Sequence, residues 1–146
     1  MITIRKFDMK DFDNVVAMYK DFIKTIYPNR KLGFDIAFYE AVINWIKSGK
    51  HIYMSQTAQG AITGFSVCSI DLNNHITEPV YFGEIAYVKP IYRGGKSAYL
   101  LYNNGSNIAK ELGLKLFANA FLSKDNVDRI QKKFGMQPQF IVMERN

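Results

Sequence analysis

The stretch that decides the fold of this chain is EIAYVKPIYRGGKSA, residues 84–98. Its first half is typical of a strand that ends before Pro90, and Gly94 and Gly95 then form a turn into an amphipathic helix. A strand that enters a helix through glycines leaves a cluster of backbone N–H groups without partners, and such a cluster suits phosphate. Glu84 lies upstream on the same strand. The stretch therefore predicts a phosphate site with a carboxylate beside it.

The composition indicates one globular domain. The 146 residues are 48% hydrophobic and 14% aromatic, which is long enough and apolar enough for a buried core. We expect a single domain over residues 1–146. The formal net charge of +6 favours an anionic ligand without saying which one, and a charge of this size also serves solubility alone. Because the lysines and arginines are dispersed, the sequence does not support a nucleic-acid surface.

The cysteine and histidine residues indicate neither a disulfide nor a metal site. Cys68 is the only cysteine, which fits a reducing compartment, and its apolar strand-like surroundings predict a buried structural thiol. His51 and His75 lack the spacing of metal ligands, so we expect no metal. The sequence starts without an apolar block of signal-peptide length, and no window is long enough for a membrane span. We expect a cytoplasmic protein with no membrane partner.

The periodicity predicts the element order β-α-α-β-β-β-α-β-α-β. Strands are expected over residues 2–7, 51–56, 61–70, 80–88, 114–121 and 140–144. Helices are expected between Asp8, an N-cap with Asp11 in a capping box, and Pro28, and over residues 35–46, 96–112 and 126–134. The three middle strands are typical of an antiparallel meander, and the strand that follows residues 96–112 should lie parallel to the strand before that helix.

The second helix, residues 35–46, carries an apolar stripe that we expect to face the core. Asp35 is its expected N-cap and Gly49 its end. The stripe consists of Ile36, Tyr39, Ile43 and Ile46. Trp45 lies near the edge of the stripe, where an aromatic side chain more often packs on a core or its rim than forms a binding platform.

The element order and residues 84–98 resemble the GNAT superfamily of N-acetyltransferases, which move an acetyl group from acetyl-CoA to an amine. The cofactor turn of that superfamily is Arg/Gln-x-x-Gly-x-Gly/Ala. Here it corresponds to RGGKSA, residues 93–98, with Lys96 in place of one glycine. The ending KFGM, residues 133–136, is similar to the Lys-Leu-Gly-Phe of the superfamily. The resemblance implies an α/β (α+β) fold with a mixed, mostly antiparallel sheet between helices, and two parallel strands that splay apart at the cofactor site.

The resemblance also implies which residues hold acetyl-CoA. The pyrophosphate would be bound by the backbone N–H groups of Gly94, Gly95, Lys96, Ser97 and Ala98. Arg93 and Lys96 would add positive charge. The pantetheine arm would pair with the strand backbone at Ala86, Tyr87 and Val88, as a missing strand would. Asn126 aligns with an asparagine that often touches the cofactor, and it is equally an ordinary helix N-cap.

Glu84 is the candidate general base, because an ammonium must lose a proton before it attacks a thioester. The alternative is a surface or salt-bridged glutamate. Many members of the superfamily have a tyrosine that protonates the leaving thiolate. Gln131 stands near that position here, so no general acid is implied.

Two functions fit these residues. The first is an N-acetyltransferase that uses acetyl-CoA and direct attack by the amine, with Glu84 as the base. The second is a catalytically silent module of the same fold that binds CoA or another protein in an assembly, which Lys96 and the absent tyrosine favour. The sequence does not specify whether the amine belongs to a small molecule or a peptide, and it leaves a homodimer open.

Overall fold

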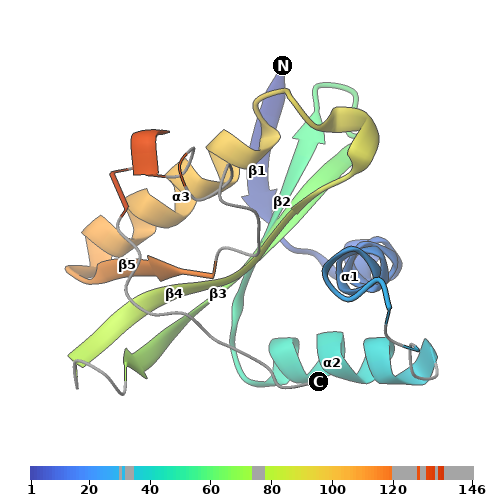
Figure 1. Cartoon of the computed structure of the whole chain (residues 1–146), viewed down its shortest axis with the longest axis horizontal. Coiled ribbons are helices and arrows are strands. Elements are labelled where there is room, and N and C mark those ends of the chain that lie inside the picture. The colour runs from blue at the N-terminus through green and yellow to red at the C-terminus, as the bar shows by residue number, and fades with distance from the viewer. Residues whose placement is uncertain are drawn as a thin grey trace.

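The computed structural model describes residues 1–29, 31, 35–73, 78–119, 128, 131–133 and 135–136. The elements run in the order β1 (Ile2–Lys6), η1 (Met9–Asp11), α1 (Phe12–Ile26), α2 (Asp35–Lys47), β2 (His51–Thr57), β3 (Ile62–Asn73), β4 (Glu78–Val88), η2 (Pro90–Tyr92), α3 (Ser97–Leu112) and β5 (Lys115–Ala118), where η is a short 3₁₀ helix (Figure 1). This agrees with the predicted order as far as β5. The strand predicted over residues 140–144 and most of the helix predicted over 126–134 lie outside the described residues.

The strands form a mixed sheet in the order β1-β2-β3-β4-β5. The neighbours from β1 to β4 are antiparallel, and β4 and β5 are parallel. The predicted meander and the predicted parallel pair are therefore confirmed. Helix α3 covers one face of the sheet, and α1 and α2 lie on the other (Figure 1). Among the described residues, no helix is long and apolar enough to cross a membrane.

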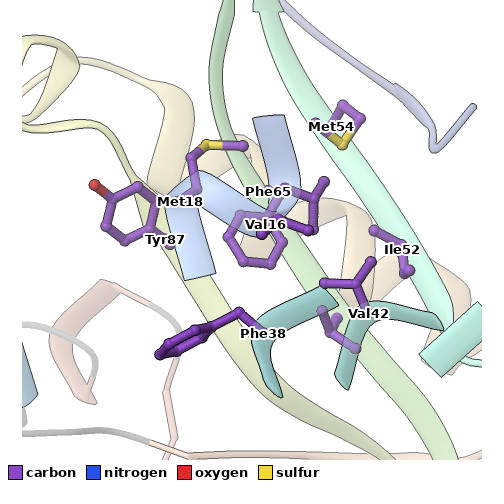
Figure 2. Close-up of a cluster of buried hydrophobic side chains, with 10 residues drawn as sticks. Val16, Met18, Phe38, Val42, Ile52, Met54, Phe65 and Tyr87 are labelled. Atoms are coloured by element: carbon purple, nitrogen blue, oxygen red, sulfur yellow. The ribbon is translucent and has the colours of Figure 1, made fainter. Parts of the chain in front are cut away.

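The larger core lies between the sheet and the helices α1 and α2 (Figure 2). Its buried side chains come from both helices and from β2, β3 and β4, and they are Val15, Val16, Met18, Phe38, Val42, Ile52, Met54, Phe65, Val67 and Tyr87. A smaller cluster on the α3 side joins Cys68, Tyr81 and Ala109. Burial raises the pKa of the Cys68 thiol to about 11, as expected for a structural cysteine.

The predicted core face of α2 is wrong. The helix buries Phe38 and Val42, and Trp45 packs on Tyr19 and Phe65 with ring centroids 4.7 and 6.4 Å apart. The expected stripe is exposed instead: Ile36, Tyr39, Ile43 and Ile46. Two apolar stripes run side by side on this helix, both with helical spacing, so periodicity alone did not distinguish them. Packing against α1 and the sheet selected the stripe of Phe38, Val42 and Trp45, while Tyr39 keeps a ring contact with Phe12 of α1.

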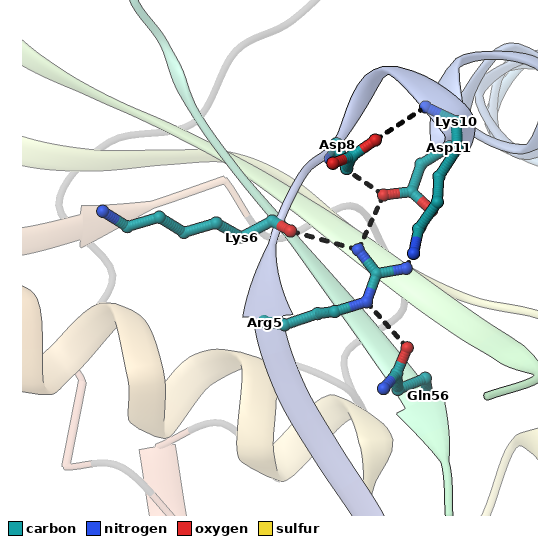
Figure 3. Close-up of polar contacts among 6 residues, drawn as sticks. All are labelled: Arg5, Lys6, Asp8, Lys10, Asp11 and Gln56. Atoms are coloured by element: carbon teal, nitrogen blue, oxygen red, sulfur yellow. Dashed lines mark hydrogen bonds and ion pairs between the residues drawn. The ribbon is translucent and has the colours of Figure 1, made fainter. Parts of the chain in front are cut away.

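A charged cap fixes the start of η1, the 3₁₀ turn that leads directly into α1 (Figure 3). The Lys10 N–H donates to the Asp8 carboxylate at 3.0 Å, and the Asp8 N–H donates to Asp11 at 2.9 Å, which confirms the predicted capping box. The Arg5 guanidinium donates to both oxygens of Asp11 at 2.7 and 2.8 Å. These hydrogen bonds hold the pKa of the Asp11 carboxyl below its usual range, although the residue is only 2% exposed. The network ties β1 to the start of the first helix.

Candidate active site at the parting of β4 and β5

The pairing of β4 with β5 ends before β4 does. It runs in parallel from Val80 and Lys115 to Gly83 and Ala118, and the Asn119 N–H donates to the Gly83 carbonyl at 2.9 Å. β4 continues to Val88, whereas β5 ends at Ala118, so residues 84–88 have no partner among the described residues of β5. We call this edge of β4 the parting, and it is the place at which the resemblance expected the two strands to splay.

A β-bulge in β4 lies at the same point. Val67 of β3 pairs with Ile85 and Cys68 pairs with Gly83, so Glu84 is an extra residue between them. Ile85 packs against the core on the α1 and α2 side of the sheet. The side chain of Glu84 reaches the same side, since its carboxylate contacts Lys50. The bulge thus places the predicted base at the edge of the parting.

The main chain of β4 beyond the bulge directs every second residue away from β3. The Lys89 N–H donates to the Thr63 carbonyl on β3. Because successive residues of a strand direct their main-chain groups to opposite sides, Tyr87 also faces β3, and Ala86 and Val88 face away from it. Of the three residues expected to pair with a pantetheine arm, Ala86 and Val88 therefore have the suitable direction.

The turn into α3 has the conformation that its glycines allow. Gly94 has a φ of +88°, a region that side chains other than glycine rarely adopt. The first hydrogen bond of the helix is Leu100 N–H to the Lys96 carbonyl, at 2.9 Å, and no described side chain caps the helix. Residues 93–96 and Ala98 are exposed. The first N–H groups of α3 are consequently available to a ligand in solution.

Lys50 forms an ion pair with Glu84 that the sequence did not indicate. Its Nζ lies 2.7 Å from each carboxylate oxygen, and each side chain is 25% exposed. Lys50 follows α2, where its N–H donates to the Trp45 carbonyl at 3.0 Å. Burial raises the pKa of Tyr19 on α1, and the nearby negative charge of Glu84 raises it further. Glu84 is thus a salt-bridged glutamate, which was the alternative interpretation of the sequence, and its role as a general base stays a prediction.

Comparison with solved structures identifies the fold. An acetyl transferase of Pyrococcus furiosus superposes on this chain with a TM-score of 0.81 at 14% sequence identity. The superposition covers the full length of this chain and 99% of that protein. A Clostridium acetobutylicum acetyltransferase solved with acetyl-CoA gives 0.75 at 22% identity, over 100% of this chain and 96% of that chain. The aminoglycoside N-acetyltransferase AAC(6')-Iy with CoA gives 0.75 at 17%, over 100% and 95%. The chain has the GNAT acetyltransferase fold.

Searches by sequence gave no such result. No family model matches the chain, and no curated protein matches it. The GNAT fold is therefore recognised here from the arrangement of the elements, and the resemblance based on residues 84–98 is confirmed at the level of the fold.

Arg93, at the start of the turn that was compared with the GNAT cofactor turn, bends back onto β4. Its Nε donates to the Val88 carbonyl at 2.8 Å, and its guanidinium lies 5.5 Å from the centroid of the Tyr87 ring. The Tyr87 hydroxyl in turn donates to Asp21 on α1. Burial is the main reason that the pKa of Tyr87 is raised to about 12, and the hydrogen bond to Asp21 adds to the rise. Arg93 therefore fixes the turn to the strand, while its expected role was to add charge for the pyrophosphate.

Ser97 of the GNAT turn also has a structural partner. Its side chain is buried and lies 2.9 Å from the Thr63 hydroxyl, which donates to Ser55 at 2.7 Å. These three hydroxyls connect the start of α3 to β3 and β2. Only the backbone N–H of Ser97 remains for a ligand at this position.

A pocket opens between α3 and the parted strands. It is lined by Ser66, Cys68, Gly83, Ile85, Ala86, Leu101, Tyr102, Gly105, Leu116, Ala118 and Asn119. A Cβ placed on Gly105 would meet no heavy atom within 4 Å, so this glycine leaves space on the sheet side of the helix. The pocket joins the parting to the helix that begins at the GNAT turn.

The structure thus places Glu84 and the turn that begins α3 beyond opposite ends of the same short stretch of β4, residues 85–88. Asn126 lies outside the described residues. Among the described residues, no group of three or more metal-ligating side chains is present. Sequence reasoning missed Lys50, because a lysine before a strand is ordinary and only the fold brings it to Glu84.

Proposed function

We propose that this chain is an acetyl-CoA-dependent N-acetyltransferase. The observation that carries the proposal is the combination of an edge of β4 beyond Gly83 without a described partner in β5, an uncapped start of α3, and Glu84 at the bulge. Solved structures with this fold include one with acetyl-CoA and one with CoA. The same three features meet the needs of a phosphorylated thioester carrier and of an amine that must lose a proton.

In this proposal acetyl-CoA binds along the α3 side of the parting. The N–H groups of residues 94–98 hold the pyrophosphate, and Lys96 at the start of the helix adds positive charge. The amides of the pantetheine arm pair with the main chain of Ala86 and with the Val88 N–H, which lie beyond the described pairing of β4 with β5. The Val88 carbonyl keeps its hydrogen bond from Arg93. The arm runs along the mouth of the pocket beside Gly105. The thioester then lies close to the bulge.

The reaction is a direct transfer. Glu84 takes a proton from the acceptor ammonium, and the amine nitrogen attacks the thioester carbonyl carbon. A new C–N bond forms as the C–S bond breaks, and the second amine proton neutralises the departing thiolate. Main-chain N–H groups of β4 stabilise the oxyanion that develops on the carbonyl oxygen. No side-chain nucleophile is required.

The second candidate is a silent module of the same fold that binds CoA or a protein partner. The ion pair between Lys50 and Glu84 favours it, because an ammonium of the protein already occupies the carboxylate. In the enzyme, the acceptor amine must share Glu84 with Lys50 or displace it.

Two measurements on the whole chain test the proposal. Isothermal titration with acetyl-CoA should give saturable binding, and a thiol-release assay against a panel of amines should give turnover. Binding without release of thiol for any amine would favour the silent module. Absence of binding would overturn the proposed function.

A further inference from the structure

A second pocket lies at the C-terminal end of α2. It is lined by Ala41, Asn44, Trp45, Lys47, Ser48 and Lys50. Helix α2 covers the face of the sheet opposite α3, so this pocket is separate from the one beside Gly105. It adjoins Glu84, since Lys50 lines it and contacts both carboxylate oxygens. An acceptor held there would approach the bulge from the side opposite the cofactor.

The charge of this pocket is positive. Lys47 and Lys50 contribute two ammonium groups, and no carboxylate is among the described lining residues. The described part of the chain offers no carboxylate partner to Lys47, and the charge of Lys50 is balanced by Glu84 alone. A purely cationic acceptor would place a further positive charge on a carboxylate that is already neutralised. Such an arrangement is unfavourable at partly buried positions.

We propose that this pocket takes an amine that also carries a carboxylate a few bonds away, as an amino acid does. This inference rests on the proposed transferase function and names its substrate class. The acceptor ammonium would contact Glu84, and the acceptor carboxylate would contact the Lys50 ammonium. Each charge then has a partner, and Lys50 remains paired when the amine takes its place on Glu84. Trp45 forms an apolar wall for the remainder of the acceptor.

The substrate class follows from the same balance. A polyamine brings several positive charges to a pocket with two lysines in a chain of net charge +6, so it should bind poorly. A zwitterionic amine adds no net charge. Lys50 thus acts as a specificity-determining residue that also positions the base.

Trp45 provides a readout that does not need turnover, because it is the only tryptophan of the chain and lines the pocket. The probes are L-amino acids and their carboxamides, which differ only in the carboxylate, with spermidine as the polycation. They are titrated with and without CoA while Trp45 fluorescence is followed. The variants are Lys50→Met, Lys50→Arg and, as the matched control on the other face of the sheet, Lys110→Met.

We expect at least one amino acid to bind saturably, with its carboxamide and spermidine weaker by about tenfold or more. Lys50→Met should abolish the difference, Lys50→Arg should keep most of it, and Lys110→Met should leave it unchanged. Equal binding of acids and carboxamides, no binding of either, or a preference that survives in Lys50→Met would overturn the inference. Loss of acetyl-CoA binding in calorimetry would instead overturn the transferase function, so the two failures are distinguishable.

Discussion

The Nζ of Lys50 lies 2.7 Å from both carboxylate oxygens of Glu84, a residue 34 positions away in the chain. The contact joins the residue that follows α2 to the bulge of β4, next to the point where the described pairing with β5 ends. It neutralises a partly buried carboxylate and holds it beside the parting. The chemistry at this point therefore depends on the carboxylate, while cofactor binding depends on the main chain and on the start of α3.

Glu84→Gln separates these two contributions. The substitution preserves size but removes the basic oxygen, so kcat at neutral pH should fall by about 100-fold or more. Acetyl-CoA affinity in calorimetry should be unchanged. Glu111→Gln, on the exposed side of α3, is the control and should leave both values as in the natural chain. Undiminished turnover of Glu84→Gln would remove this residue from the mechanism.

Gly94→Ala and Gly60→Ala form a matched pair. Both glycines have a positive φ, +88° and +89°, and an added Cβ would meet nothing within 4 Å at either position. Each substitution should lower the free energy of unfolding by about 1 kcal/mol through backbone strain alone. Only Gly94→Ala should also weaken acetyl-CoA binding, by about tenfold, because it displaces the N–H groups of the turn. Equal cofactor affinity in both variants would show that the turn does not hold the cofactor.

At Gly105 a small side chain should change stability, and a large side chain should change acetyl-CoA binding. Gly105→Ala should raise the free energy of unfolding by about 0.5–1 kcal/mol, since alanine favours the helix and the added Cβ meets open space. Gly105→Leu should fill the pocket beside the parting and weaken acetyl-CoA binding by about tenfold or more. Thermal unfolding and calorimetry give the two values. If Gly105→Leu bound acetyl-CoA with unchanged affinity, the pantetheine arm would not lie beside Gly105.

Val42 and Ile43 test which face of α2 packs on the core. Val42 is fully buried, whereas Ile43 is 38% exposed. Val42→Ala should cost about 2 kcal/mol of unfolding free energy, and Ile43→Ala should cost less than about 0.5 kcal/mol. Chemical denaturation measures both. The reverse order would restore the face that the periodicity predicted.

Asp11 should make the stability of the fold depend on acid pH. Hydrogen bonds from Arg5 lower the pKa of Asp11 in the folded chain. The stabilisation is therefore complete above the unfolded pKa of about 4 and is lost as the pH falls through the lower folded value. Asp11→Asn should cost about 2 kcal/mol at neutral pH and flatten the dependence below pH 4. If the unfolding free energies of the natural chain and of Asp11→Asn fell equally as the pH is lowered, the ion pair of Arg5 and Asp11 would not have this role.

Much of the architecture could be predicted from local patterns. Asp8 and Asp11 mark the start of the first helix, Gly113 ends α3 with a φ of +70°, and the alternation of the middle strands gives the meander. The turn at Gly94 could be predicted because a pair of glycines after a strand is typical of a backbone that needs a positive φ. These features depend on neighbours in the sequence, so the residues that cause them are close together in the chain.

The contacts that define the site could not be predicted in this way. No residue near Lys50 in the sequence indicates that its partner is Glu84. The sequence also does not show whether the Arg93 side chain binds a phosphate or the Val88 carbonyl, because that depends on how the strand and the turn are placed. The two stripes of α2 are equivalent until α1 and the sheet select one.

The sequence by itself determined where the chain turns, where its helices begin and end, and that a glycine turn follows a strand bearing Glu84. The tertiary structure alone decided that β4 bulges at this glutamate, that the described pairing of β4 with β5 ends one residue earlier, and that Lys50 reaches the carboxylate. The reason is physical. Backbone preferences act over a few residues, whereas the pairing of strands and charges far apart in the chain is set by the packing of the whole domain.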